Sequence, residues 1–291
     1  MSTVADGRVS ATTDAKATAR DAWDRCAQGW NDHAPAIRRW LAAATEAMLE
    51  MAGIRPGDHV LDVAAGAGDQ TLDIARRVGA QGRVLATDLS PEILRHAKRN
   101  AEAEGLTQVD TLVGDGERLP VPSGGFDAVV CRLGLMLFPD PLQGLREMHR
   151  ALRAGGGVCT LVFSAPQANP CIGILLRTAL RHAGLPPPDP WQPGGLLSLG
   201  QPGRLDALFR SAGLRDVATT AVDAPFRLPS VQDYLRFVRA SASPIQRILG
   251  RLDPAAEQAA WDDIEAQLAG FTTPDGWVGP NELLLTAARK P

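Results

Sequence analysis

The sequence predicts an α/β protein with a doubly wound parallel sheet, and three observations support this. Between residues 58 and 163, apolar segments of strand length alternate with amphipathic segments of helix length, as in repeated βαβ units. The first strand segment runs through a glycine-rich turn directly into a helix. The first three strand segments each carry an aspartate at or near the end: Asp62, Asp88 and Asp115.

The central unit is the stretch from residue 58 to residue 71. Residues 60–63 form an apolar, partly β-branched run, typical of a strand that is covered on both faces. Gly66 and Gly68 then allow a sharp turn and a close approach of the backbone to a ligand. Helical spacing resumes over residues 72–78, and such a strand, turn and helix together bind nucleotide-like ligands.

Asp62 indicates which kind of ligand this loop accepts. A dinucleotide-binding loop presents a helix N-terminus to an anionic pyrophosphate, which a carboxylate would repel. S-adenosylmethionine (SAM) carries a sulfonium and an ammonium and no phosphate, so an acidic residue beside the loop suits it. Thr71 also stands where a dinucleotide fingerprint has its third glycine. The loop therefore favours SAM over NAD, and an NAD-dependent oxidoreductase remains the alternative.

The second strand, residues 83–88, ends in Asp88. This residue lies 88 − 68 = 20 positions after Gly68, the spacing at which βαβ units place the acid that binds the ribose hydroxyls. A carboxylate can accept hydrogen bonds from both of these O–H groups. The alternative is that Asp88 only caps the next helix, but Ser90 is available for that role.

Two further strands place candidate residues at the same edge of the sheet. The strand over residues 109–115 ends in Asp115, which can accept a hydrogen bond from an adenine amino group or can be a simple turn residue. The strand over residues 126–132 ends in Arg132, followed by Leu133. Because ligands of open α/β sheets bind at the carboxyl ends of the strands, these residues should line the site.

The remaining elements follow from residue spacing. A proline-rich loop over 184–202 is typical of a lid or a disordered connector, and Trp191 within it could close a pocket. The other expected elements are helices over 91–104 and 141–153, glycines 155–157 ahead of a strand over 158–163, a helix over 170–183, a helix over 203–212, a strand over 216–222, helices between 230 and 270, and a last strand over 282–288.

The N-terminal region predicts a disordered tail over residues 1–16 and two helices over residues 17–53, broken at 32–35. Trp30 belongs to a set of tryptophans that either cover a ligand or pack the helices onto the core. His33, at the helix break, is the first candidate for a catalytic base. The alternative for His33 is a surface or packing role.

Composition excludes several classes. Hydrophobic residues make up 45% of the 291 residues and the net charge is −3, so nucleic acid is not an expected partner. The four cysteines form no C-x-x-C pair, so we expect reduced thiols, no metal site and a cytoplasmic protein. Arsenic methylation through thiolates is a further alternative, although Cys131 and Cys159 fall within predicted buried strands. No apolar run approaches the length of a membrane span.

The whole set resembles the class I SAM-dependent methyltransferases. Within that class, residues 58–163 resemble the menaquinone/ubiquinone-biosynthesis C-methyltransferase family. The motifs that carry the resemblance are Val60–Asp69, Asp88, Asp115–Pro120, Gly125–Val129 and Leu133–Leu135 ahead of Pro139 and Asp140.

The resemblance implies roles for individual residues. The glycine loop and Arg132 should face the methionyl part of SAM, Asp88 the ribose, and Asp115 with Gly116 the adenine. The family usually has a hydroxyl residue where Ala67 and Arg132 stand, so these two positions depart from its pattern. The expected cofactor contacts are Asp62, Ala64, Gly66, Ala67, Gly68, Asp88, Leu89, Asp115, Gly116 and Arg132, and the expected substrate contacts are Trp30, Leu133 and Trp191.

The resemblance also implies a Rossmann-like sheet of seven strands, the last of them antiparallel, with helical cap and lid insertions. We expect a lid over 17–53, a SAM-binding core over 54–229 and 280–291, and a substrate-selecting helical cap over 230–279. The expected activity is methyl transfer from SAM to an O, C or N atom of a small, largely apolar molecule, with S-adenosylhomocysteine as product. A non-catalytic SAM-binding accessory protein is the alternative of another class, and the oligomeric state stays open.

Overall fold

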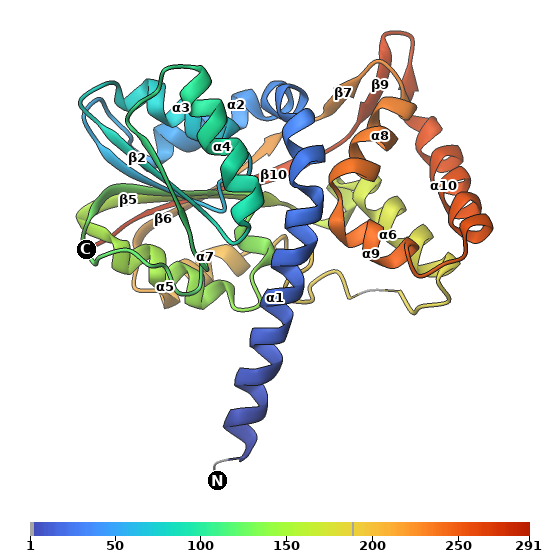
Figure 1. Ribbon diagram of the computed structural model, residues 1–291, viewed down its shortest axis with the longest axis horizontal. Coiled ribbons are helices and arrows are strands. Elements are labelled where there is room, and N and C mark those ends of the chain that lie inside the picture. The colour runs from blue at the N-terminus through green and yellow to red at the C-terminus, as the bar shows by residue number, and fades with distance from the viewer. Residues whose placement is uncertain (1–2, 188) are drawn as a thin grey trace.

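The computed structural model describes residues 3–187 and 189–291, and it describes side chains from residue 16 onward except at 188 and 243. Figure 1 shows a twisted sheet with helices on both faces, beside a smaller and mainly helical part. We call the first part the core and the second the cap. Helix α1 (Thr3–Asp32) runs between them. It contacts α4 (Pro91–Ala103) of the core and α8 (Val231–Ser241) of the cap.

The core sheet has seven strands. In order across the sheet they are β3 (Val109–Val113), β2 (Arg83–Asp88), β1 (His59–Val63), β4 (Phe126–Arg132), β5 (Leu152–Phe163), β10 (Glu282–Arg289) and β6 (Arg215–Asp223). The first five strands are mutually parallel, and β10 pairs antiparallel with both β5 and β6. This topology confirms the predicted fold class and the antiparallel last strand.

Helices cover both faces of the sheet. One face carries α2 (Ala34–Ala52), α3 (Asp69–Val78) and α4 (Pro91–Ala103), and the other carries α5 (Pro141–Ala151) and α7 (Arg204–Ser211) (Figure 1). The start of α4 has the expected cap, because the Ser90 hydroxyl accepts a hydrogen bond from the Ile93 amide at 3.1 Å. Asp88 is therefore not needed to cap this helix.

The cap has its own apolar cluster. It contains α6 (Pro170–His182), α8 (Val231–Ser241), α9 (Ser243–Leu249), α10 (Pro254–Leu268) and a small antiparallel sheet of β7 (Phe226–Leu228), β9 (Gly276–Gly279) and β8 (Thr272–Thr273). The small sheet was not expected in a region whose sequence predicts helices. Its centre is Trp277, which is fully buried and donates a hydrogen bond to the Leu268 carbonyl at 2.8 Å.

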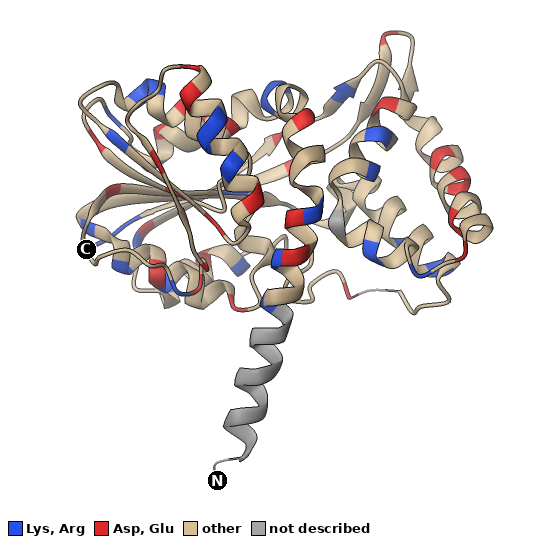
Figure 2. Ribbon diagram, in the orientation of Figure 1, with Lys and Arg blue, Asp and Glu red and all other residues tan. Residues whose placement is uncertain are grey.

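Helix α6, which was expected in the core, contributes Cys171, Leu175 and Ala179 to this cluster and Ile172 to the cluster of the core. The charged residues of α10 are all acidic (Figure 2). One of them, Asp263, pairs with Arg181 and with the Nε2 atom of His182 on α6. Apolar contacts and these ion pairs together join α6 to the cap.

The predicted break between the first two helices is present, because α1 ends at Asp32 and α2 begins at Ala34. The disordered tail predicted over residues 1–16 falls, apart from Lys16, on residues whose side chains lie outside the description, and it stays a prediction. Lys16 lies in α1 and is one-fifth exposed.

The four cysteines are free, as expected, and all four are buried, as was expected for Cys131 and Cys159. Burial raises the pKa of Cys131 and of Cys159 to about 12, so neither forms a reactive thiolate near neutral pH. This argues against thiolate chemistry at arsenic. Among the helices that the structure describes, none combines the length and the apolar character needed to cross a membrane.

The prediction that glycines 155–157 precede the strand is wrong, because they lie inside β5. Their backbone exchanges hydrogen bonds with Lys290 at the end of β10. A Cβ atom added at Gly157 would lie 2.0 Å from the Ala52 carbonyl oxygen. The missing side chain therefore allows the end of α2 to contact the strand directly.

Asp62 ties β1 to the start of α3. Its side chain is fully buried and accepts hydrogen bonds from Thr71 Oγ1 at 2.6 Å and from Gln70 Nε2 at 3.0 Å. Burial raises the pKa of Asp62 to about 7, although both hydrogen bonds and the nearby Arg132 favour the charged form. The carboxylate thus lies beneath the glycine loop and anchors both of its ends.

We predict that Gly157→Ala lowers the free energy of unfolding by about 1–3 kcal/mol, because the new methyl group overpacks the contact with α2. The measurement is chemical denaturation followed by circular dichroism. Gly270→Ala is the matched control, because a Cβ there meets nothing within 4 Å. Equal stability of the two variants would contradict the close approach.

A second prediction concerns pH. Folding raises the pKa of Asp62 from 3.8 to about 7. The stability that protonated Asp62 contributes is therefore complete below about pH 3.8 and is lost as the pH rises through about 7. We expect Asp62→Asn to remove this dependence, since the new amide can still accept from Thr71. Denaturation at about pH 5 and about pH 8 measures the difference. The exposed Asp110, changed to Asn, is the control, and an unaltered pH profile in Asp62→Asn would refute the assignment.

Candidate functional site

Two adjoining cavities lie between the core and the cap. The polar cavity, of about 1350 Å³, opens at the carboxyl ends of β1, β2 and β4. The apolar cavity, of about 830 Å³, lies between the core, α1 and the cap. Residues that line both are Trp23, Trp30, Leu133, Leu137 and Pro244. The two cavities therefore share a wall, and molecules bound in them would meet there.

The glycine loop forms one side of the polar cavity. Ala64 has φ of 56° and Gly66 has φ of 60°, so the chain leaves β1 in the left-handed region. A Cβ atom at Gly134, which follows β4, would lie 2.5 Å from the Ala64 side chain. Glycine at this position lets the ends of β1 and β4 come together, and Ala64, Gly66 and Gly134 all line the cavity.

Asp88 connects the loop to the end of β2. Its Oδ2 atom accepts from the Gly66 amide and its Oδ1 atom from the Ser90 amide, both at 3.0 Å. Burial raises the pKa of Asp88, and these amides oppose that shift. Each carboxylate oxygen has a second lone pair, so Asp88 keeps capacity to accept from a ligand while it holds the loop. Its neighbour Leu89 also lines the cavity.

Acidic residues also occupy the end of β3. Asp115 and Glu117 line the cavity, and Lys16 of α1 reaches both, with Nζ 2.6 Å from Asp115 Oδ2 and 2.5 Å from Glu117 Oε2. Gly116 lies beneath the ring of Phe138, because a Cβ atom there would come within 2.2 Å of the ring. An aromatic ring, two carboxylates and a glycine backbone thus form this end of the cavity.

Arg132 reaches the cavity from the end of β4, and it is 6% exposed. Its guanidinium pairs with Asp69, at the first turn of α3, and donates to Thr45 Oγ1 at 2.9 Å. A hydroxyl residue, which the resemblance leads one to expect here, could not form this ion pair. The departure from the family pattern therefore has a local structural role.

Three of the expected cofactor contacts do not line the polar cavity: Asp62, Ala67 and Gly68. Ala67 is fully buried, and its carbonyl accepts from Asn100 Nδ2 at 3.0 Å. Gly68 begins α3, and a Cβ there would lie 2.9 Å from the Cβ of Ala97. These residues lie behind the part of the loop that lines the cavity, and their contact with a cofactor stays a prediction.

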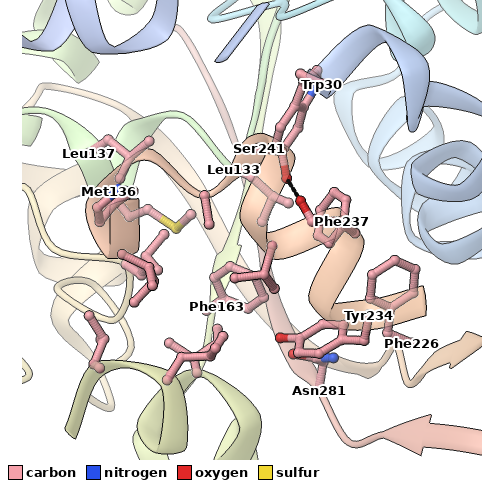
Figure 3. Close-up of a pocket in the computed structure, with 18 of the residues that line it drawn as sticks. Trp30, Leu133, Met136, Leu137, Phe163, Phe226, Tyr234, Phe237, Ser241 and Asn281 are labelled. Carbon is pink, nitrogen blue, oxygen red and sulfur yellow. Dashed lines mark hydrogen bonds between the residues drawn. The ribbon is translucent and has the colours of Figure 1, made fainter. Parts of the chain in front are cut away.

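The apolar cavity is lined by aromatic and aliphatic side chains (Figure 3). Its polar lining residues are Tyr234, Ser241 and Asn281. Trp30 and Leu133, which were expected to contact a substrate, line both cavities. Leu133 has φ of 56°, a strained value for leucine that directs its side chain to the shared wall.

Trp191 and His33 do not line either cavity. The loop that carries Trp191 contributes Gly194 and Leu196 instead. His33 Nδ1 lies 2.8 Å from the Gly29 carbonyl oxygen, and its ring packs edge-on against Phe237 with centroids 5.5 Å apart. This geometry matches the packing alternative for His33, and a role for His33 as a base stays a prediction.

Sequence reasoning missed Lys16, Phe138 and Tyr234. Lys16 falls within the predicted tail, where no signal identifies it. Phe138 closely follows the strand end at Arg132, so its position alone could have placed it near the site. Tyr234 is the only tyrosine of the chain and interrupts an apolar helical stripe, which was a usable signal.

Comparisons of the sequence and of the fold with known proteins both identify relatives of this chain. The model of the ubiE/COQ5 methyltransferase family matches residues 38–173. A demethylmenaquinone methyltransferase of Deinococcus radiodurans is 33% identical over 187 residues, which are 61% of this chain and 75% of that protein. A ubiquinone/menaquinone biosynthesis C-methyltransferase UbiE of Teredinibacter turnerae is 38% identical over 120 residues, 41% of this chain and 48% of that protein. The chain spans about half the length of most of the curated relatives it matches.

The fold also occurs in solved structures. The YcgJ protein of Bacillus subtilis has a TM-score of 0.57 and 19% identity, and the match covers 86% of this chain and 99% of that one. This likeness extends beyond residues 38–173 but concerns the fold alone. The extent of the match to the Deinococcus protein shows the family: the chain belongs to the ubiE/COQ5 methyltransferase family.

Proposed function

We propose that this protein transfers a methyl group from SAM, bound in the polar cavity, to a small and largely apolar molecule bound in the apolar cavity. S-adenosylhomocysteine is then the product. The observation that carries the proposal is the shared wall at Trp30 and Leu133, which joins a cavity with nucleotide-compatible groups to one lined by apolar rings.

The residues of the polar cavity fit SAM. Asp88 retains lone pairs for ribose hydroxyls, and Asp115 can accept from an adenine amino group if Lys16 shifts its contact. The backbone of Ala64 and Gly66 and the guanidinium of Arg132 are available to the methionyl part. A pyrophosphate fits less well, because the carboxylates of Asp62 and Asp69 already lie at the start of α3.

SAM supplies an electrophilic methyl group on a positively charged sulfur. The acceptor's lone pair forms the new bond as the carbon–sulfur bond breaks, and the electron pair stays on sulfur. The apolar lining excludes water and aligns the acceptor, which accounts for much of the rate in such a displacement. Of the described residues that line the apolar cavity, none carries a carboxylate, an imidazole or an amine. The acceptor's proton would therefore leave before the acceptor binds, or after methyl transfer, once the product reaches solvent.

The alternatives are less well supported. A SAM-binding accessory protein without turnover needs no acceptor pocket, yet an apolar cavity adjoins the polar one. An NAD-dependent oxidoreductase would have to bind a pyrophosphate at the start of α3, where the carboxylates of Asp62 and Asp69 lie. His33 as base and a cytoplasmic location stay predictions.

The first test is calorimetric titration of the purified protein with SAM, S-adenosylhomocysteine and NAD in parallel. We expect both adenosyl ligands to bind and NAD not to bind. Screening phenols, quinols and amines for methylation would follow. Binding of NAD without the adenosyl ligands would overturn the proposal.

Asp88→Ala tests the ribose site. We expect SAM affinity to fall by about 1.5–3 kcal/mol, because a charged acceptor is lost. The variant also frees the Gly66 amide, so circular dichroism must first establish that it is folded. Asp110→Ala, on the neighbouring strand β3 and exposed, is the control. Unchanged affinity in folded Asp88→Ala would reject the assigned role.

A further inference from the structure

Two polar side chains in the apolar cavity have hydrogen-bonding capacity that the protein does not use. Tyr234 is 6% exposed, and no hydrogen bond joins its hydroxyl to any described residue. Asn281 is 8% exposed, and its Nδ2 donates to the Gly279 carbonyl at 3.1 Å, which leaves Oδ1 without a described donor. Neither atom is among the fully enclosed, unpartnered side-chain atoms of the described residues, so both remain accessible from the cavity, where a ligand or water can complete their hydrogen bonds.

Two other polar groups that line the same cavity are satisfied. Ser241 Oγ donates to the Phe237 carbonyl at 2.6 Å (Figure 3). Trp40 Nε1 donates to the Ala224 carbonyl at 2.7 Å. No described hydrogen bond uses the indole N–H of Trp23 or Trp30, but these two rings line both cavities, whereas Tyr234 and Asn281 line the apolar cavity alone.

Both groups are held rigidly. The Tyr234 ring stacks on Trp277, with centroids 4.4 Å apart, and Phe226 packs edge-on against it at 5.8 Å. The Asn281 carbonyl accepts from the Ala224 amide at 2.8 Å, which fixes its backbone. Figure 3 shows both side chains pointing into the cavity, on the side away from Trp30. Preorganised groups of this kind bind a ligand without a large ordering cost.

The surrounding surface restricts the ligand further. The described lining of the apolar cavity contains no group that is charged near neutral pH. Burial raises the pKa of Tyr234, so its hydroxyl stays neutral. A charged ligand would lose its hydration without gaining an ion pair, which is unfavourable.

We propose that Tyr234 and Asn281 form a specificity pair that selects a neutral, apolar acceptor with a hydroxyl or carbonyl group on the side remote from the methylated atom. This inference deepens the proposed function. It depends on that function only in placing the methylated atom next to the polar cavity. Tyr234 can donate to either polar group, and Asn281 Oδ1 can accept from a hydroxyl. Both residues lie outside residues 38–173, the part that the family model matches.

The test compares three probes of one ring system: naphthalene, 2-naphthol and 2-naphthoate. Binding is followed without SAM by quenching of tryptophan fluorescence, because Trp23, Trp30 and Trp40 line the cavity. In the wild type we expect 2-naphthol to bind about three- to tenfold more tightly than naphthalene, as one neutral hydrogen bond provides. We expect 2-naphthoate to bind more weakly than 2-naphthol.

Tyr234→Phe keeps the ring stack and removes the hydroxyl. We expect it to reduce 2-naphthol affinity about three- to tenfold and to leave naphthalene affinity unchanged. Ser241→Ala is the matched control, since that hydroxyl is already bonded to Phe237, and it should retain the wild-type preference for 2-naphthol.

Three results would overturn the proposal. They are failure of the wild type to bind 2-naphthol, equal binding of all three probes, and a Tyr234→Phe variant that keeps the preference or weakens naphthalene equally. The wild-type comparison needs no variant to fold. Because SAM is absent from these titrations, failure of SAM to bind in calorimetry would refute the methyl-transfer proposal separately.

Discussion

A buried group of three charges, Asp62, Asp69 and Arg132, holds the ligand-binding edge of this protein together. None is more than 6% exposed. Asp62 on β1 accepts a hydrogen bond from Thr71 at the start of α3. Arg132 at the end of β4 pairs with Asp69 in the same helix turn and donates to Thr45 of α2. Burial is the main reason that the pKa of Asp62 is raised, while the charge of Arg132 lowers that pKa and the charge of Asp69 raises it. Because an unpaired buried charge is costly, loss of any member would disturb the loop that all the others position.

The family model matches one part of the molecule and not the other. The region that the family model matches supplies β1 to β5 and the loops that form most of the polar cavity. Helix α1 and most of the cap lie outside it, yet they provide much of the apolar lining. A core of this kind can keep one cofactor geometry while the attached helices change the acceptor. The rings of Trp30 and Phe237, one from α1 and one from α8, pack together at 6.2 Å where these outer parts meet.

Local sequence determined the order of the elements, the glycine loop and the acids at the strand ends. The reason is physical: a strand buried on both faces requires a continuous apolar run, and a polar residue at its end is conspicuous. Asp88, Asp115 and Arg132 were therefore identifiable by position, and each lines the polar cavity. The resemblance also placed Ala67 and Gly68 among the cofactor contacts, and neither lines the polar cavity. Motif spacing does not record which side of a loop faces a cavity, so these two contacts stay predictions.

Tertiary structure alone decided which side chains face the cavities and what they meet there. Asp62 is anchored to Thr71, His33 packs on Phe237, and Lys16 reaches two acids about a hundred residues away in the chain. The apolar cavity depends on contacts among α1, the core and the cap, and no local pattern records such long-range packing. Sequence by itself thus determined the family, the fold and the edge of the sheet at which the polar cavity opens. The shape and polarity of the apolar cavity arise only when distant helices close over that edge.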